Sequence, residues 1–341
     1  MENAIISKEK LPELFTQIIA KNKLFAPVKE NGFSLFKEVE KASEIDTSYV
    51  NTRVPPKSII FKQTETLFHF TPGKKGNVEK IPEENEKIVI YAIRTCDAKA
   101  FALLDPVFIG DFEDPYYSAR RRNSVLIGLS CNNPGPACFC TSFDDSPASI
   151  EYVDILFTDL GYKYYIEGNS EIGKKFLEDH KTLFDAASGE DQKSRDKVER
   201  EAIGKIKRTM KLTGIVEKLD GMFDHPIWYE SARKCIGCGT CTYLCPTCHC
   251  FDMQDESTLN KGARIRVWDS CMYPEYTHHA SGHNPRPARM NRVRNRVYHK
   301  FNYFPKNTEV FGCTGCSRCI EYCSANIDII EIINKIGEVK E

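Results

Sequence analysis

The sequence predicts two domains: an α+β or α/β domain over residues 1–220 and a mainly α-helical domain over residues 221–341. The strongest strand signals, continuous apolar runs bounded by polar residues, lie in the first part. Two copies of one cysteine pattern lie in the second part. With 341 residues, of which 41% are hydrophobic, the chain is long enough to form two separate cores.

The first elements along the chain are a helix and four strands. An early proline and an apolar stripe predict a helix over residues 8–21. Two short runs that resemble strands follow at 58–62 and 66–70. Residues 87–93 and 124–129 are continuous apolar runs, and we expect them to be buried strands of a parallel sheet.

Weaker signals complete the first domain. Residues 97–104 predict a short helix with an acidic first turn, and the tyrosine-rich segments 151–159 and 161–167 predict a strand pair. From 171 to 212 the pattern is helical and charged, with a polar exposed loop expected at 186–195. One face of this helical segment is predicted to carry Val198, Ala202, Ile206 and Met210.

The second domain is dominated by two cysteine runs of the form C-x2-C-x2-C-x3-C, which begin at Cys235 and at Cys313. This spacing ligates [4Fe–4S] clusters in two-cluster ferredoxins, where the fourth cysteine of each run binds the other cluster. A zinc site needs only four ligands in two pairs. The crossed ligand sets expected here are Cys235, Cys238, Cys241 and Cys323 for the first cluster, and Cys313, Cys316, Cys319 and Cys245 for the second.

A long insert separates the two runs, whereas the runs of a small bacterial ferredoxin lie close together. Residues 326–336, after the second run, carry a strong isoleucine stripe that predicts a helix. We therefore expect a helical, ferredoxin-like domain in which each binding loop caps a helix and loop N–H groups donate to cluster sulfurs.

Four further cysteines follow the two strongest strands of the first domain. In a parallel sheet the carboxyl ends of the strands share one edge, where sites form. We expect a third [4Fe–4S] cluster there, with Asp97 as an alternative ligand, although ordinary burial of free thiols is the competing interpretation. The cysteines of this group are Cys96, Cys131, Cys138 and Cys140.

Three cysteines beside the first run have irregular spacing, which defines no metal geometry. We favour the interpretation that they pack as small hydrophobic residues; a further metal site or a reactive thiol is the alternative. They are Cys248, Cys250 and Cys271, with His249, His279 and His283 near them in sequence.

The stretch 286–300 holds six lysines or arginines and no acidic residue. A solvated helix face is one interpretation, and neutralisation of anionic clusters or docking of a partner subunit is another. Nucleic-acid binding is the least favoured, because Tyr298 is the only aromatic residue available for stacking. The candidate docking or cluster-neutralising side chains are Arg289, Arg292, Arg294 and Arg296.

Composition and missing motifs restrict the possible activities. The net charge of −1 gives no global field for nucleic acid or anionic membrane, and no segment resembles a signal peptide or a membrane span. Cysteines in metal-ligand spacing favour a reducing, anaerobic cytoplasm over disulfides. No dinucleotide, phosphate-binding or hydrolase motif is present. Substrate and hydride chemistry are therefore expected on other chains.

Several blocks of sequence resemble one family: the A subunit of anaerobic sulfite reductase and the β subunit of cytosolic NiFe (sulf)hydrogenases. They are PTCHCFDM at 246–253, VWDSC at 267–271, ASGHNPRP at 280–287, RVRNRVYHKF at 292–301, ETLFHF at 65–70, RTCDAK at 94–99, DPYY at 114–117 and CFC at 138–140. Family members often carry proline after the last cysteine of the second run, where this chain has Ser324. That proline shapes a turn and is not a ligand.

The resemblance implies an iron–sulfur subunit that passes electrons between a flavin-containing subunit that handles NAD(P)H and a catalytic subunit. Two other classes of function stay open. One is a reductase that acts directly on a small sulfur species through Cys248, Cys250 and Cys271. The other is a cluster-based redox sensor that binds nucleic acid through residues 286–300.

Overall fold

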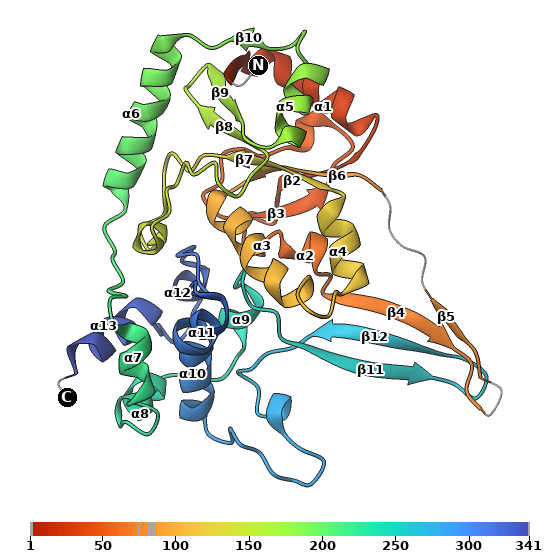
Figure 1. The fold of residues 1–341 in the computed structure, drawn as a ribbon, viewed down its shortest axis with the longest axis vertical. Helices are drawn as coiled ribbons and strands as arrows, with labels where there is room; N and C mark the ends of the chain where they lie inside the picture. The colour runs from red at the N-terminus through yellow and green to blue at the C-terminus, as the bar shows by residue number, and fades with distance from the viewer. Residues whose placement is uncertain (1–2, 74–75, 81–85, 340–341) are drawn as a thin grey trace.

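A computed structural model describes residues 3–73, 76–80 and 86–339. Its amino-terminal part is built on an eight-stranded mixed sheet in the order β10-β1-β9-β8-β7-β6-β2-β3 (Figure 1). The strands are β1 (Asn3–Ser7), β2 (Lys23–Glu30), β3 (Phe33–Glu38), β6 (Ile88–Ile93), β7 (Ser124–Leu129), β8 (Ile155–Asp159), β9 (Lys163–Gly168) and β10 (Asp185–Ala186).

The centre of this sheet is parallel, as predicted from its apolar runs. Strand β6 pairs in parallel with β2 and β7, and β7 pairs in parallel with β8. All six residues of β6 are buried, because helices or loops cover both faces. Strands β8 and β9 form the predicted antiparallel pair, which turns at Gly161 with a φ of 102°.

Six helices of the described part of the chain accompany the sheet. The predicted helix over residues 97–104 is longer, because α3 begins directly after the carboxyl end of β6, and 58–62 is a helical turn and not a strand. Pro56 precedes that turn, and Phe61 donates its backbone N–H to the Lys57 carbonyl at 2.7 Å. The helices are α1 (Leu11–Ile19), α2 (Lys57–Ile60), α3 (Thr95–Phe108), α4 (Pro115–Arg122), α5 (Glu171–Asp179) and α6 (Gly189–Lys205).

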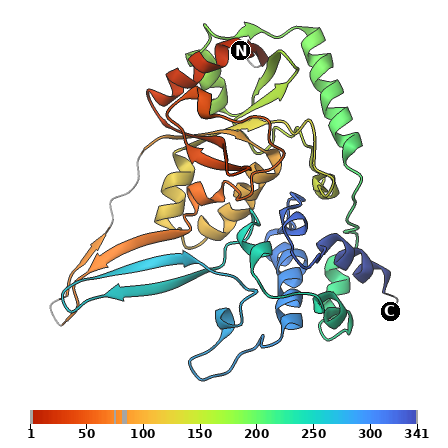
Figure 2. The same ribbon diagram turned by 180° about the vertical axis from the view of Figure 1, so that it is seen from behind.

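Helix α6 corrects two expectations for the charged segment. It begins inside the predicted loop 186–195, because Ser188 and Asp191 form a capping box at its start. It also ends at Lys205, so Ile206 and Met210 do not extend the face that carries Ala202. The chain then runs extended towards the carboxyl-terminal helices, along one side of the molecule (Figures 1 and 2).

A second sheet joins segments from both halves of the chain. Its antiparallel order is β11-β12-β4-β5, with β11 (Phe251–Ser257), β12 (Gly262–Trp268), β4 (Thr64–Phe70) and β5 (Val78–Lys80). Only β4 was predicted. Both views show the sheet projecting to one side (Figures 1 and 2). The hairpin β11–β12 belongs to the second half of the sequence, so strands from both sides of residue 220 share this sheet.

The carboxyl-terminal part is mainly helical and has its own core, which contains the isoleucines of α13, Trp228 and Phe301. Its helices are α7 (Ile215–Asp220), α8 (Ile227–Ala232), α9 (Thr240–Tyr243), α10 (Arg289–Tyr298), α11 (Phe304–Thr308), α12 (Arg318–Glu321) and α13 (Ile329–Glu338), with a π-helical turn at His299–Tyr303. No helix in the described ranges combines the length and apolarity that crossing a membrane requires.

Candidate iron–sulfur centres

The two cysteine runs fold into the same local unit. In each run a residue with positive φ, Gly239 at 75° or Ser317 at 67°, starts a four-residue helix. The third cysteine lies on that helix, as Cys241 on α9 and Cys319 on α12. Helices α9 and α12 contact each other, so the sequence repeat becomes a paired structural repeat.

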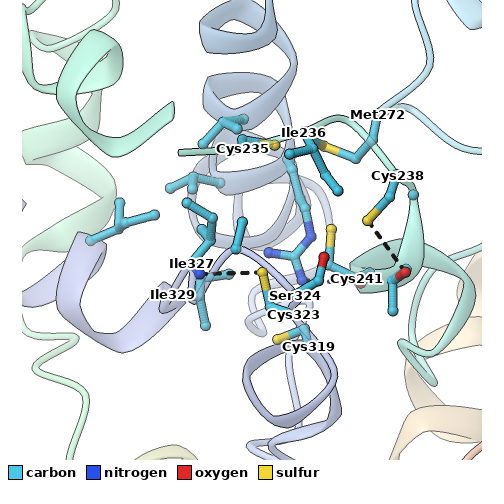
Figure 3. Close-up of a pocket in the computed structure, with 17 residues that line it drawn as sticks. Cys235, Ile236, Cys238, Cys241, Met272, Cys319, Cys323, Ser324, Ile327 and Ile329 are labelled. Atoms are coloured by element: carbon cyan, nitrogen blue, oxygen red, sulfur yellow. Dashed lines mark hydrogen bonds between the residues drawn. The ribbon is translucent and has the colours of Figure 1, made fainter. Parts of the chain in front are cut away.

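The first group of thiols surrounds one pocket. Cys235, Cys238 and Cys241 line it together with a cysteine of the other run, Cys323 (Figure 3). The backbone N–H of Ile327 donates to the Cys323 sulfur at 3.2 Å, which holds this side chain at the pocket. The structure thus brings together the four residues that the spacing assigns to the first cluster.

The second group is more deeply enclosed. The thiols of Cys313, Cys316 and Cys319 lie within electrostatic range of the Cys245 thiol, the last cysteine of the first run. Burial raises the pKa of the Cys313 thiol to about 11, so this thiol is neutral at pH 7 unless a metal displaces its proton. Since Cys319 also lines the first pocket, the two groups are neighbours.

Buried cations lie among these sulfurs. Arg296 donates to the Cys241 carbonyl at 3.2 Å, and its charge interacts with Cys241 and Cys319, which belong to different groups. Lys300 donates to Thr247 and to the Gly312 carbonyl, both at 2.7 Å. Among the described residues, no carboxylate lies within 4.0 Å of either cation. Because buried charges need compensation, this site suits an anionic group such as a thiolate-bound cluster.

These contacts favour cluster neutralisation over an exposed docking surface or a solvated face for most of the arginines of 286–300. Arg292, Arg294 and Arg296 are all less than one tenth exposed, and each donates to backbone carbonyls. Arg289 donates to the Cys235 carbonyl at 2.8 Å. Arg289 itself is exposed, whereas the other three arginines lie inside the protein, so the docking and nucleic-acid interpretations keep only one of the four candidate charges at the surface.

The four cysteines of the first domain gather where β6 and β7 end. Arg94, which is buried, donates to the carbonyls of Leu129 and Ser130 at 3.2 and 2.6 Å and fixes that edge. The charges of Cys138 and Cys140 interact with Cys131, and that of Cys96 interacts with Cys140. The structure therefore brings Cys96, Cys131, Cys138 and Cys140 into one neighbourhood.

This neighbourhood lies directly against the second cysteine run. Phe139 donates its N–H to the Gly315 carbonyl at 3.0 Å, and the Cys138 sulfur lies 3.6 Å from the Ser317 hydroxyl. A Cβ at Gly315 would lie 2.4 Å from the Cys140 nitrogen, so only glycine permits this approach. The alternative ligand Asp97 points both oxygens at the buried Arg318 guanidinium, at 2.6 and 2.7 Å.

We expected the last three cysteines to pack among apolar side chains, and the structure shows a different environment. Cys248, Cys250 and Cys271 line a cavity together with His249 and two of the buried cations. The other histidines near them in sequence, His279 and His283, are exposed and pair with each other.

Comparisons with known proteins agree with the geometry. Residues 234–327 match the model of a 4Fe-4S dicluster domain. Over 334 residues the chain is 31% identical to the β subunit of sulfhydrogenase 2 from Pyrococcus furiosus, which covers 98% of this chain and 98% of that protein. The chain belongs to the sulfhydrogenase β-subunit family.

Membership of this family confirms the resemblance drawn from the sequence blocks. As a sulfhydrogenase β-type chain with a dicluster domain, the protein is an iron–sulfur electron-transfer subunit that binds two [4Fe–4S] clusters. The matched domain contains all eight cysteines of the two runs.

Sequence reasoning missed the cations Lys57 and Arg318. Arg318 lies inside the second run, and Lys57 reaches the Cys248 carbonyl at 2.6 Å from the other half of the chain. An arginine between two ligand cysteines was a usable signal. Nothing in the sequence connects Lys57 with a cysteine 191 residues away.

Proposed function

We propose that this chain relays electrons between a subunit that binds flavin and handles NAD(P)H and a catalytic subunit of a hydrogenase or sulfite-reductase type. The observation that carries the proposal is the adjacency of two four-thiol groups around one buried arginine, Arg296. Bound clusters accept and release single electrons. The Pyrococcus furiosus relative is a subunit of a sulfhydrogenase, which supports partner subunits for this chain.

We further propose crossed ligation of the two clusters. Cys323 belongs to the first cluster and Cys245 to the second, so each run supplies three ligands to one cluster and one to the other. The pocket shared by Cys323 with Cys235, Cys238 and Cys241 supports the first set. The electrostatic contacts of Cys245 with Cys313, Cys316 and Cys319 support the second.

A third [4Fe–4S] cluster in the first domain is also part of the proposal. Its ligands are Cys96, Cys131, Cys138 and Cys140, because both carboxylate oxygens of Asp97 are engaged by Arg318. Support comes from the position of these thiols against the Gly315–Ser317 backbone of the second run. Electrons entering the chain would thus have a continuous set of thiol-bound centres.

The first thiol group offers an approach for a redox partner. Cys238 is exposed, and the adjacent Ile236 is 63% exposed, whereas Cys245 and Cys316 in the second group are buried. Electron transfer between proteins requires the two redox groups to come close, so the surface around Ile236 is the docking face that we propose for the flavin-containing subunit.

The experiment uses the full chain reconstituted anaerobically and freed of other subunits. The three clusters proposed here account for about twelve of its irons, at about four per cluster, and the chain should bind neither flavin nor NAD(P)H. Mixing it with the purified flavin subunit and NAD(P)H in a stopped-flow instrument should reduce its clusters. Stoichiometric flavin in the isolated chain, or clusters that the flavin subunit fails to reduce, would contradict the relay.

A further inference from the structure

Three thiols that the relay does not use gather beside the second cysteine group. Cys248, Cys250 and Cys271 line one cavity with His249, His299 and Lys300. Cys248 contacts the Cys245 thiol, and Cys250 contacts Cys271, so the sulfurs form a continuous group from two segments of the chain. Segments 245–250 and 269–271 are held together by the Asp269 N–H, which donates to the Cys250 carbonyl at 2.9 Å.

The charges around this cavity call for an anion. Lys57 is 2% exposed; its ammonium donates to the Cys248 carbonyl at 2.6 Å and lies 4.3 Å from the centre of the Trp268 ring. Within the described part of the chain, no carboxylate pairs with Lys57. The ammonium interacts electrostatically with Cys248, Cys245 and Cys250. A neutral thiol offers no compensation for a buried ammonium, whereas metal-bound thiolates do.

Two imidazoles complete the donor set. His249 is held by its Nδ1, 3.1 Å from the Thr247 carbonyl, which leaves Nε2 available as a ligand. The His299 ring has no hydrogen-bond partner among the described residues, and its centre lies 5.3 Å from that of His249. His299 begins the π-helical turn after α10, and such turns are frequent at functional sites.

The arrangement distinguishes a cluster from a single ion. In the ranges that the structure describes, no three His, Cys, Asp or Glu side chains converge closely enough to hold one metal ion. The donors surround a cavity instead, as the cysteines of the first run do. A zinc ion draws its four ligands to one point at about 2.0–2.3 Å, whereas a cluster of several irons occupies a volume between its ligands.

We propose that Cys248, Cys250 and Cys271 bind a further [4Fe–4S] cluster, with the imidazole of His249 or His299 as its fourth ligand. This centre goes beyond the relay, since its assembly is independent of any partner. Its position beside Cys245 makes it a neighbour of the second cluster, and Lys57, Lys300 and Arg296 supply positive charge around it.

The first test compares iron and sulfide contents of the anaerobically reconstituted full chain and its Cys248→Ser/Cys250→Ser/Cys271→Ser variant. The variant should contain about four fewer irons per chain and keep the spectrum of the paired clusters. Tyr276→Phe is the matched control: its hydroxyl contacts Cys250 in the same region but is not a proposed ligand, so its iron content should not change. Equal iron in the wild-type protein and the triple variant, or loss of zinc in place of iron, would overturn the proposal.

A second measurement does not depend on folding of the triple variant. Electron spin echo modulation of the reduced wild-type protein should reveal a nitrogen coordinated directly to iron. This coupling should disappear in one of the variants His249→Ala and His299→Ala and persist in the other. A wild-type protein without any coupled nitrogen would exclude the imidazole ligand and overturn this ligand set, whether or not the relay itself operates.

Discussion

Replacement of Asp97 tests whether the buried ion pair with Arg318 fastens the second cysteine run to the first domain. Arg318 lies between Cys316 and Cys319, and its guanidinium is fully buried. It donates to both Asp97 oxygens at 2.6 and 2.7 Å and to the Thr52 carbonyl at 2.7 Å. Since Asp97 lies in the first turn of α3, the pair joins the second thiol loop to the main sheet.

Asp97→Asn keeps the shape of the side chain and removes its charge. The buried guanidinium then loses its counter-charge, and breaking a buried pair in this way costs about 3–5 kcal/mol. We expect the lower end, because Arg318 keeps its two Thr52 contacts. At about 2.1 cal/mol/K per residue, the unfolding entropy of the 341-residue chain is roughly 0.7 kcal/mol/K, so about 3 kcal/mol lowers the unfolding midpoint by roughly 4 °C.

The assay is thermal unfolding of the reconstituted protein under anaerobic conditions, followed by cluster absorbance and by circular dichroism. The pair Asp255–Arg264 provides a matched control: it has two oxygen–nitrogen contacts at 2.7 Å but is exposed to solvent. Asp255→Asn should therefore leave the midpoint unchanged within error. Equal midpoints for the wild-type protein, Asp97→Asn and Asp255→Asn would refute the argument that the Asp97–Arg318 pair fastens the loop.

Three further predictions concern the two central thiol groups. Arg296→Leu should lower the midpoint potentials of both clusters, because it removes one buried positive charge that lies beside both. A potentiometric titration followed by electron paramagnetic resonance measures these potentials. A shift confined to one cluster would contradict the position of Arg296 between the two clusters. Cys323→Ser should alter the signal of the cluster bound by the first run, and a change limited to the second cluster would exclude crossed ligation. Ile236→Glu should slow cluster reduction by the flavin subunit without loss of iron, whereas an unchanged rate would place the docking face elsewhere.

The features that the sequence predicted well are encoded locally. Ligand spacing within each run follows from a loop and a four-residue helix, so the runs identify the dicluster domain that spans residues 234–327. The parallel pair β6–β7 was recognisable because both strands are continuous apolar runs. The convergence of the four first-domain cysteines followed from the shared edge of those strands, and their ligation of a cluster stays a prediction.

The features that the sequence did not predict depend on tertiary contacts. Strand β11 is exposed along its whole length, so it has no apolar alternation to reveal it. A short apolar run at 58–62 fits either a strand or one helical turn, and the prolines before it decide for the helix. A solvated face was one interpretation of the arginines of α10, because charge runs usually are solvated, and only the tertiary structure shows that Arg292, Arg294 and Arg296 are buried against backbone carbonyls.

The burial of those arginines links the fold of the carboxyl-terminal part to its clusters. Helix α10 inserts Arg296 between the two thiol groups, and Lys300 follows on the π-helical turn. The Cys241 and Gly312 carbonyls accept hydrogen bonds from Arg296 and Lys300, but they do not neutralise the charge, and the buried Nε of Arg296 has no hydrogen-bond partner among the described residues. A thiolate is stable in such a buried position when a metal replaces the proton of the thiol. A thiolate-bound cluster is anionic, and its negative charge compensates the buried cations. The sequence thus encodes the same cofactor twice: as ligand spacing in the two runs, and as the buried cations Arg296 and Lys300 between them, which have no carboxylate partner among the described residues.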